Sequence, residues 1–494
     1  MKRILSKGLA VVLALAACTG CKSTEGETFH YVNLSQVLCT FLGEENQPLE
    51  ITVKASPADY EVAPGASWLK AEKSEDGKTL TLTVEDNETG AERSTTVTVE
   101  AGQAVQQITV NQLAKDNEFV RYRRLETFQS GAAISPNGKY VGGFVPSIAP
   151  DDSWQYSPTI IDMETGDVYE FGPYPEAVYY MTDNMCISDQ GVLFIHDGSH
   201  GGMIIVDTEG NVTKLDAYEG YRGAPIISSV SADGRYWVGY AREDVIGKGL
   251  CKPLLWTDGV AQELPLPDLN YRDEEIWYGV MARGISANGE IIYGTSWENS
   301  DFGMLYWINN GENTAKPEWV GKDVREVTPV VMKMSDGTEY DYHIVNGMIC
   351  TANLTNISAT GKWIAGSYRT ETPADDRISV ITTQTAAFYN TETETTVIVE
   401  DYGESTGVHA TDDGIAFIGV GSLGISSGKV YDLNTGTDLG STQEWVYDNY
   451  GIVIPAGYIN HVSADGRFVL GTKAESSAMG VAFINWYIAP PIVK

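Results

Sequence analysis

The sequence predicts an all-β chain in which a β-sandwich is followed by a seven-bladed β-propeller. Residues 35–114 alternate apolar and polar residues between turn residues, and residues 119–494 repeat Ser/Thr-x-x-Gly seven times between apolar segments. The Ser or Thr anchors of successive repeats lie 53, 43, 55, 72, 53 and 52 residues apart. Short strands that recur about every 50 residues are typical of propellers.

The first domain is predicted from its alternating segments, which are residues 50–53, 79–84, 95–99 and 107–110. Alternation with period two predicts strands that bury one face, and several such strands predict a sandwich. The polar residues 114–118 mark the boundary with the second domain.

Four motifs in this domain resemble the BACON domain: Trp68-Leu69, Leu80 to Val84, Asn87 followed by Arg93-Ser94, and Ile108 to Gln112. The resemblance covers about 80 residues, and it implies an immunoglobulin-like fold on envelope proteins of the Bacteroidetes, often beside carbohydrate-handling modules. It also leaves two roles open for Trp68, either core packing or stacking on a sugar.

Each repeat of the second domain predicts a four-stranded blade. The seven turns are residues 135–138, 188–191, 231–234, 286–289, 358–361, 411–414 and 463–466, with Gly supplying the positive φ. The last repeat stops after its third strand, so we expect the orphan strand 119–127 to complete that blade and protect its edge. Trp256 ends a third strand and is predicted to lie in the core. The repeats resemble TolB-like and HAF-type propeller repeats.

The N-terminus predicts a secretion signal over residues 1–17, with three basic residues and then a short apolar run. The ending Leu15-Ala16-Ala17-Cys18 resembles the lipobox of bacterial lipoproteins. The resemblance implies that Cys18 is lipidated, that residues 18–34 form a tether, and that the lipid anchors the protein in the outer membrane, at the cell surface or on its periplasmic face. An ordinary cleaved signal is the alternative, and Cys21 is a weaker lipidation site.

Composition restricts the partners. The net charge of −34 argues against nucleic acid and against anionic membrane surfaces, so the membrane is expected to be reached through the N-terminal lipid alone. The spacing of the 6 cysteines predicts neither a disulfide framework nor a zinc site. The expected partner is a glycan or an envelope protein.

The short turns assign one face of the propeller to the scaffold. The other face carries longer loops rich in aromatic and charged residues, where ligand sites usually lie. Aromatic rings stack on sugars and polar groups bind their hydroxyls. The candidate ligand residues on this loop face are Trp154, Tyr156, Tyr221, Arg222, Asp273, Trp277, Trp297, Tyr368 and Arg369. Tyr271, Arg272 and Glu274 crowd the same loop as Asp273. Each of these residues could instead cover a blade edge.

Two further patterns involve histidine. Six repeats have Gly five residues after the turn Gly, whereas the second has His196, which makes His196 a candidate for a functional departure or a simple irregularity. His409 and His461 occupy matching positions on neighbouring inner strands. They could share a metal with Asn356 or pack as hydrogen-bonded core residues. No cofactor is predicted, and a divalent cation is left open.

The long spacing between the fourth and fifth anchors is assigned to an insertion over about residues 320–351. Asp336-Gly337 between two apolar segments predicts a hairpin that projects over the face, as a lid, a partner contact or a tolerated insertion.

These features predict a non-enzymatic binding or scaffold lipoprotein that recognises a glycan or an envelope partner through the loop face. No nucleophile elbow, metalloprotease or nucleotide-binding motif is present in the sequence. The alternative is a glycoside hydrolase or lyase that uses carboxylates of the loop face, for which Asp273, Glu274, Asp375 and Asp376 are the candidates, or His196. Glycans assayed for binding and for product release distinguish the two hypotheses.

Overall fold

The computed structural model describes most of the chain from residue 30 to residue 488. The described residues are 30–34, 38–41, 43–44, 46, 48–91, 93–112, 114–115, 122–125, 132–148, 150–151, 154–163, 167–172, 174–175, 185–197, 202–221, 224–242, 251–298, 301–311, 315–350, 356–421, 427–450, 453–454, 456–464, 468–477 and 480–488. The proposed leader, Cys18 and the tether up to residue 29 lie outside the described residues. The chain divides into two compact units, and the first holds the described residues up to Glu88 together with Arg93–Gln112.

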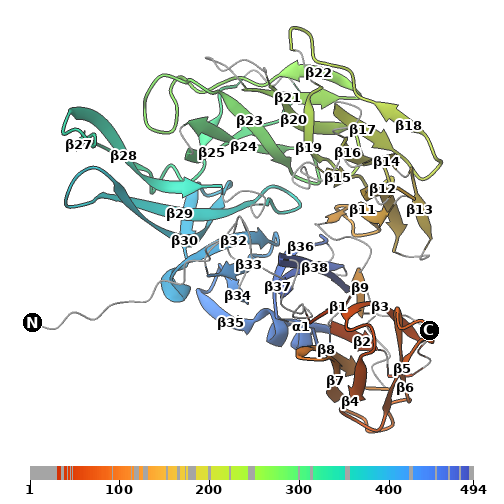
Figure 1. Cartoon of the computed structure of the whole chain (residues 1–494). Helices are drawn as coiled ribbons and strands as arrows, with labels where there is room; N and C mark the ends of the chain where they lie inside the picture. The colour runs from red at the N-terminus through yellow and green to blue at the C-terminus, as the bar shows by residue number, and fades with distance from the viewer. Residues whose placement is uncertain are drawn as a thin grey trace, which may run out of the picture. The chain divides into compact units, whose positions relative to one another are not determined.

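The first unit consists of two four-stranded sheets (Figure 1). One has the order β1 (Tyr31–Leu34), β3 (Leu49–Ser56), β6 (Thr79–Val84), β5 (Leu69–Lys73), and the other the order β2 (Leu38–Phe41), β8 (Ala104–Gln112), β7 (Arg93–Ala101), β4 (Glu61–Pro64). The alternating residues of β6 bury Leu80 and Leu82 completely, as period-two alternation predicts. Trp68 packs partly buried against this core, and the guanidinium of Arg93 lies 4.4 Å from its ring centroid. This geometry favours a packing role for Trp68.

The second unit is all-β in the repeats that the sequence predicts. The first three repeats form separate sheets. The first contains β10 (Ala132–Ile134), β11 (Tyr140–Ile148), β12 (Trp154–Asp162) and β13 (Val168–Glu170), with β14 (Tyr174–Pro175) paired to β12. The second contains β15 (Met185–Ile187), β16 (Leu193–Asp197), β17 (Gly202–Val206) and β18 (Val212–Lys214). The third contains β19 (Ile226–Val230), β20 (Tyr236–Arg242), β21 (Cys251–Thr257) and β22 (Val260–Glu263). Trp256 on β21 is 3% exposed, so its predicted core position is confirmed.

The fourth and fifth repeats share one sheet, contrary to the expectation of separate blades. It contains β23 (Val280–Ile285), β24 (Ile291–Glu298), β25 (Asp301–Ile308) and β26 (Glu318–Trp319), then β29 (Trp363–Pro373), β30 (Val380–Asn390) and β31 (Thr395–Ile398). The insertion supplies β27 (Glu326–Lys333) and β28 (Glu339–Ile349), which pair as the predicted hairpin. The end of β28 joins the two repeats because Gly303 pairs with Ile349 and β28 pairs with β29. Figure 1 shows this hairpin in teal beside β29 and β30.

The sixth and seventh repeats complete the second unit. The sixth has η2 (Glu400–Tyr402), β32 (Ser405–Ala410), β33 (Ile415–Val420), β34 (Ser427–Asp432) and β35 (Thr437–Ser441), followed by α1 (Thr442–Tyr450). The seventh has β36 (Tyr458–Val462), β37 (Val469–Ser477) and β38 (Gly480–Ile488). As predicted, the fourth strand of this sheet comes from the beginning of the unit, because β9 (Tyr122–Leu125) pairs antiparallel with β38.

The Ser-x-x-Gly turns are built by local hydrogen bonds. In the third repeat, the Ser231 hydroxyl donates to Asp233 Oδ1 at 2.6 Å and accepts from the Tyr236 backbone N–H at 3.0 Å. Gly234 has a φ of 70°, which few other residues adopt easily. The anchor serine is fully buried, so its hydroxyl takes the place of water for the turn backbone. No helix among the described residues has the length and apolar character needed to cross a membrane.

Candidate functional site

Four inner strands contain a β-bulge at the same place in the repeat. The register shifts between Ile227 and Ser229, between Ala282 and Gly284, between Gly407 and His409, and between Ile459 and His461. The extra residue is therefore Ser228, Arg283, Val408 or Asn460, each three residues before its anchor. Bulges re-aim a side chain and are common beside functional sites. All four bulge residues line one cavity.

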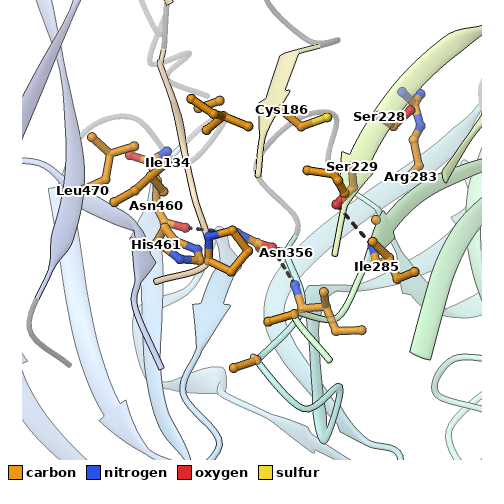
Figure 2. Close-up of a pocket in the computed structure, with 18 of the residues that line it drawn as sticks. Ile134, Cys186, Ser228, Ser229, Arg283, Ile285, Asn356, Asn460, His461 and Leu470 are labelled. Carbon is orange, nitrogen blue, oxygen red and sulfur yellow. Dashed lines mark hydrogen bonds between the residues drawn. The ribbon is translucent and has the colours of Figure 1, made fainter. Parts of the chain in front are cut away.

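This central cavity has a volume of about 270 Å³. The ends of the inner strands line it, together with the residues that follow the anchors, such as Pro136, Ala287 and Ala464. It therefore lies toward the Ser-x-x-Gly turns, the side that the sequence analysis assigned to the scaffold. Figure 2 shows its lining, with Arg283 and Ser228 on one side of the view and Asn460 and His461 on the other. Its polar side chains among the described residues are Ser228, Ser229, Arg283, Tyr293, Asn356, Asn460 and His461.

Three of these polar side chains already bond to the protein. Ser229 Oγ accepts from the Ile285 backbone N–H at 3.3 Å, and Asn356 Oδ1 accepts from the Ile357 backbone N–H at 2.8 Å. Asn460 Oδ1 accepts from the Thr472 hydroxyl at 2.5 Å. Three buried atoms in the lining have no hydrogen-bond partner among the described residues: Ser228 Oγ and Arg283 Nε on the other side of the cavity, and His461 Nε2. These groups are available to a ligand.

The two histidines on the inner strands meet beside the cavity. The ring centroids of His409 and His461 lie 5.0 Å apart. Burial lowers the pKa of His461 to about 4, and burial and the neighbouring His461 lower the pKa of His409 far below its usual value. Both rings are therefore neutral at pH 7. Asn356 donates to the Asn460 carbonyl at 3.4 Å, and in the part of the chain that the structure describes no three His, Cys, Asp or Glu side chains cluster as metal ligands would.

Burial disfavours the thiolate form of the cavity cysteine. Cys186 lines the cavity, and burial raises the pKa of its thiol well above the usual value. Cys186, Cys251 and Cys350 are buried and free, so among the described residues these cysteines form no disulfide.

The predicted loop residues with described side chains fall into three groups, of which Arg369 forms one by itself. Asp273 and Trp277 are exposed, with 46% of the Trp277 surface accessible, and Arg325 Nη2 donates to Asp273 Oδ1 at 2.6 Å. Tyr221 and Tyr368 are half-buried and pack against hydrophobic clusters, so most of their ring surface serves packing.

Arg369 belongs to a buried ion cluster rather than to an open surface. Its Nη2 lies 3.1 Å from Glu371 Oε1, and Glu371 is 3% exposed. Arg272 donates to both oxygens of the same carboxylate. The loop before β23 and strand β29 are therefore brought together here, beside the hairpin.

Tyr271 and Arg272 do not lie open on the loop face, which corrects the sequence-based interpretation. Tyr271 is 1% exposed and packs with Val345 and Ile349 of β28, while Arg272 is 6% exposed with Tyr342 against it. The inserted hairpin supplies these contacts, and its position over this loop is not apparent from the sequence. Glu274 Oε1 lies 3.4 Å from His343 Nδ1 of the hairpin.

Other candidates are placed by their backbone alone. Trp154 and Tyr156 lie on β12, His196 on β16 and Trp297 on β24, with side chains outside the description, and Arg222 lies outside the described residues. The glycine pattern that singled out His196 has a packing cause. A Cβ at Gly239 would come within 1.8 Å of the Ile226 carbonyl, and one at Gly294 within 2.5 Å of the Met281 carbonyl. The β15–β16 register of the second repeat has no bulge.

His461 and Asn356 of the same cavity were sequence-based candidates, whereas the bulge residues were not. Their signal is positional: three residues before each anchor the chain reads Ala132, Met185, Ser228, Arg283, Thr355, Val408 and Asn460, an irregular mixture inside apolar strands. A polar or charged residue in a predicted buried strand is informative, because burial without a partner is costly.

Comparison with known proteins gives one family match. Residues 58–113 match the BACON family, described as "Putative binding domain, N-terminal". No curated protein sequence matches the chain.

Solved structures with similar folds are distant. An oligogalacturonate lyase from Vibrio parahaemolyticus is 10% identical, with a TM-score of 0.44 over 87% of this chain and 98% of that chain. The β-propeller domain of the Trilobed protease from Pyrococcus furiosus is 11% identical, with a TM-score of 0.38 over 83% and 97%. A periplasmic gluconolactonase from Pseudomonas aeruginosa is 13% identical, with a TM-score of 0.31 over 64% and 84%.

Proposed function

We propose that this chain is an envelope binding protein with an immunoglobulin-like sandwich followed by a seven-bladed propeller. The four-stranded sheets of the second, third, sixth and seventh repeats and the pairing of β9 with β38 support a ring of seven blades. The two sheets that share one core support the sandwich. The match to BACON supports binding as the general role.

We infer that Cys18 carries a lipid that anchors the protein in the outer membrane, facing the cell surface or the periplasm. The lipobox-like ending of the leader supports this anchor. The protein would then act without catalysis, as a receptor or scaffold for a glycan or an envelope partner.

We place the ligand in the central cavity. One observation carries this conclusion: bulges aim side chains of differing chemistry from several repeats into one cavity. Ligand pockets are usually about 300–1,000 Å³, so a cavity of about 270 Å³ suits a ligand the size of one sugar unit. The ligand would be a terminal sugar or a free monosaccharide, rather than a long chain lying across the face.

The loop face is the second candidate. Trp277 carries this alternative, since an aromatic side chain that is 46% exposed offers a stacking surface for a longer glycan. Asp273 and Glu274 lie four and three residues before it in the chain, and the ion pair of Asp273 with Arg325 holds that loop in place.

Two sets of variants test the location. The mature protein is titrated calorimetrically with a panel of neutral and acidic monosaccharides and short glycans, and product release is followed by mass spectrometry. Ser228→Leu and Val408→Phe fill the cavity, and Trp277→Ala removes the exposed ring. Val212→Phe on β18, at a side chain that is 47% exposed, is the matched control for added bulk.

We expect both cavity variants to weaken binding at least tenfold while Trp277→Ala and the control bind normally. Loss of binding confined to Trp277→Ala would place the site on the loop face. Release of a shortened product would make the protein an enzyme, and absence of binding across the panel would overturn the proposed function.

A further inference from the structure

The central cavity holds one charged residue whose charge is not balanced. Among its described lining residues Arg283 is the one cation, and none is Asp or Glu, although the chain has 67 acidic residues against 33 basic ones. No described residue forms an ion pair with Arg283. The guanidinium carbon of Arg283 lies 5.8 Å from the ring centroid of Tyr240.

Part of the Arg283 guanidinium has lost water without gaining a hydrogen bond. The residue is half-buried, and its Nε is buried with no hydrogen-bond partner among the described residues. Arg283 also occupies the bulge of β23, where the strand departs from regular pairing. Proteins keep such locally unfavourable arrangements mainly at functional sites, so this position of Arg283 indicates a role in binding.

A second unpartnered group occupies the equivalent position in the preceding repeat. Ser228 is the bulge residue of β19, and its hydroxyl is buried with no hydrogen-bond partner in the part of the chain that the structure describes. The two strands are adjacent, because the Ile285 N–H of β23 donates to Ser229 Oγ of β19. Figure 2 shows Ser228 and Arg283 on the same side of the lining.

We propose that the central cavity binds the carboxylate of a sugar acid of the uronate class, with Arg283 and Ser228 as the carboxylate-binding pair. This proposal rests on the proposed function and adds the charge of its ligand. The guanidinium donates two parallel hydrogen bonds to a carboxylate, and the Ser228 hydroxyl donates a third. The sugar hydroxyls extend toward Asn460 and His461.

The charge balance favours a carboxylate over a phosphate. Both histidines near the cavity are neutral, so Arg283 supplies a single positive charge, which a monoanion neutralises. A phosphate ester carries close to two negative charges at neutral pH and needs a second cation. The described lining contains none.

Calorimetric titration of the mature protein tests this assignment with D-galacturonate, D-glucuronate, the matching neutral sugars and D-glucose 6-phosphate. Arg283→Met removes the charge, Arg283→Lys keeps the charge without the planar fork, and Ser228→Ala removes the hydroxyl. Arg235→Met is the matched control, because Arg235 is 51% exposed and pairs with Asp258 outside the cavity.

We expect the wild-type protein to bind a uronate at least tenfold more tightly than its neutral counterpart. Arg283→Met should abolish that preference, Arg283→Lys and Ser228→Ala should reduce it, and Arg235→Met should keep it. The melting temperature of Arg283→Met should equal or exceed that of the wild type, whereas a packing role for Arg283 on Tyr240 predicts a lower one.

The outcomes separate this inference from the proposed function. Equal binding of neutral and acidic sugars that the cavity-filling variants abolish would overturn the uronate assignment and keep the cavity as the site. Preference for the phosphate ester, or an undiminished preference in Arg283→Met, would also overturn it. Absence of any binding would overturn both proposals.

Discussion

Arg272 and Glu371 are 99 residues apart in the chain and form a buried two-point ion pair, with N–O distances of 2.9 and 2.8 Å. Their side chains are 7% and 3% exposed. The Val345 backbone N–H of the inserted hairpin also donates to Glu371, at 3.0 Å. The Glu371 carboxylate on β29 therefore binds both the loop before β23 and the inserted hairpin.

Replacing Glu371 with Gln should destabilise the second unit by about 3–5 kcal/mol, because Arg272 and Arg369 would lose their buried counter-charge. Urea unfolding followed by tryptophan fluorescence measures the loss. Asp268→Asn is the control, since its pair with Lys316 is exposed and should contribute about 1 kcal/mol or less. Similar losses in both variants would contradict this role for the cluster.

The strand β9 should be required for the stability of the second unit. A fragment of residues 119–494 keeps the pairing with β38 and should fold, whereas a fragment of residues 130–494 exposes the edge of β38. We expect the shorter fragment to melt at least about 5 °C lower and to aggregate more readily. Equal melting temperatures would show that the pairing contributes little.

Acid should destabilise the protein through its buried histidines. His461 has a pKa of about 4 in the folded protein against an ordinary value of 6.5, so the unfolded chain binds the extra proton between these values and stability falls as the pH decreases. From pH 6.5 to pH 5 this one group should cost about 2 kcal/mol.

The variant His461→Asn should lose this part of the pH dependence, whatever its stability at pH 7. Unfolding free energies measured across pH 5 to 7.5 provide the slope, and His343→Asn, at a half-exposed histidine, is the control. An unchanged slope in His461→Asn would mean that His461 is not held neutral by burial.

The recurring glycine of strand two should tolerate no side chain at Gly239. An added Cβ would come within 1.8 Å of the Ile226 carbonyl, so the backbone of β19 would have to move. We expect Gly239→Ala to cost about 3 kcal/mol or more, as overpacking against backbone does. Val212→Ala, at a largely exposed site, should change the unfolding free energy by about 0.5 kcal/mol or less, and parity between the two would exclude the steric explanation.

The turns could be predicted from the sequence because their hydrogen bonds connect residues close in the chain. Ser231, Asp233 and Gly234 are such a set, and five residues separate Ser231 from its backbone donor Tyr236. The pairing of β9 with the last repeat could be inferred by elimination. The segment that contains β9 belongs to no repeat, and the last repeat has three strands where the other repeats predict four.

The central cavity could not be predicted in the same way. A bulge adds one residue to a strand, and repeats of unequal length hide that addition. The burial of Arg272 depends on a carboxylate 99 residues away, so no local pattern distinguishes Arg272 from an exposed arginine. Sequence periodicity thus predicted the strands, whereas the side chains near the cavity and under the hairpin depend on distant contacts.

The pairing of β9 with β38 has a consequence for the order in which the protein is made. The ribosome synthesises β9 before the strands of all seven repeats and β38 after nearly all of them. At about 5–20 residues per second, β9 waits roughly 20–70 s for its partner, long after the first unit is complete. During that interval the growing sheets have an unpaired edge, so chaperones that protect nascent chains should bind the second unit until its last strand emerges.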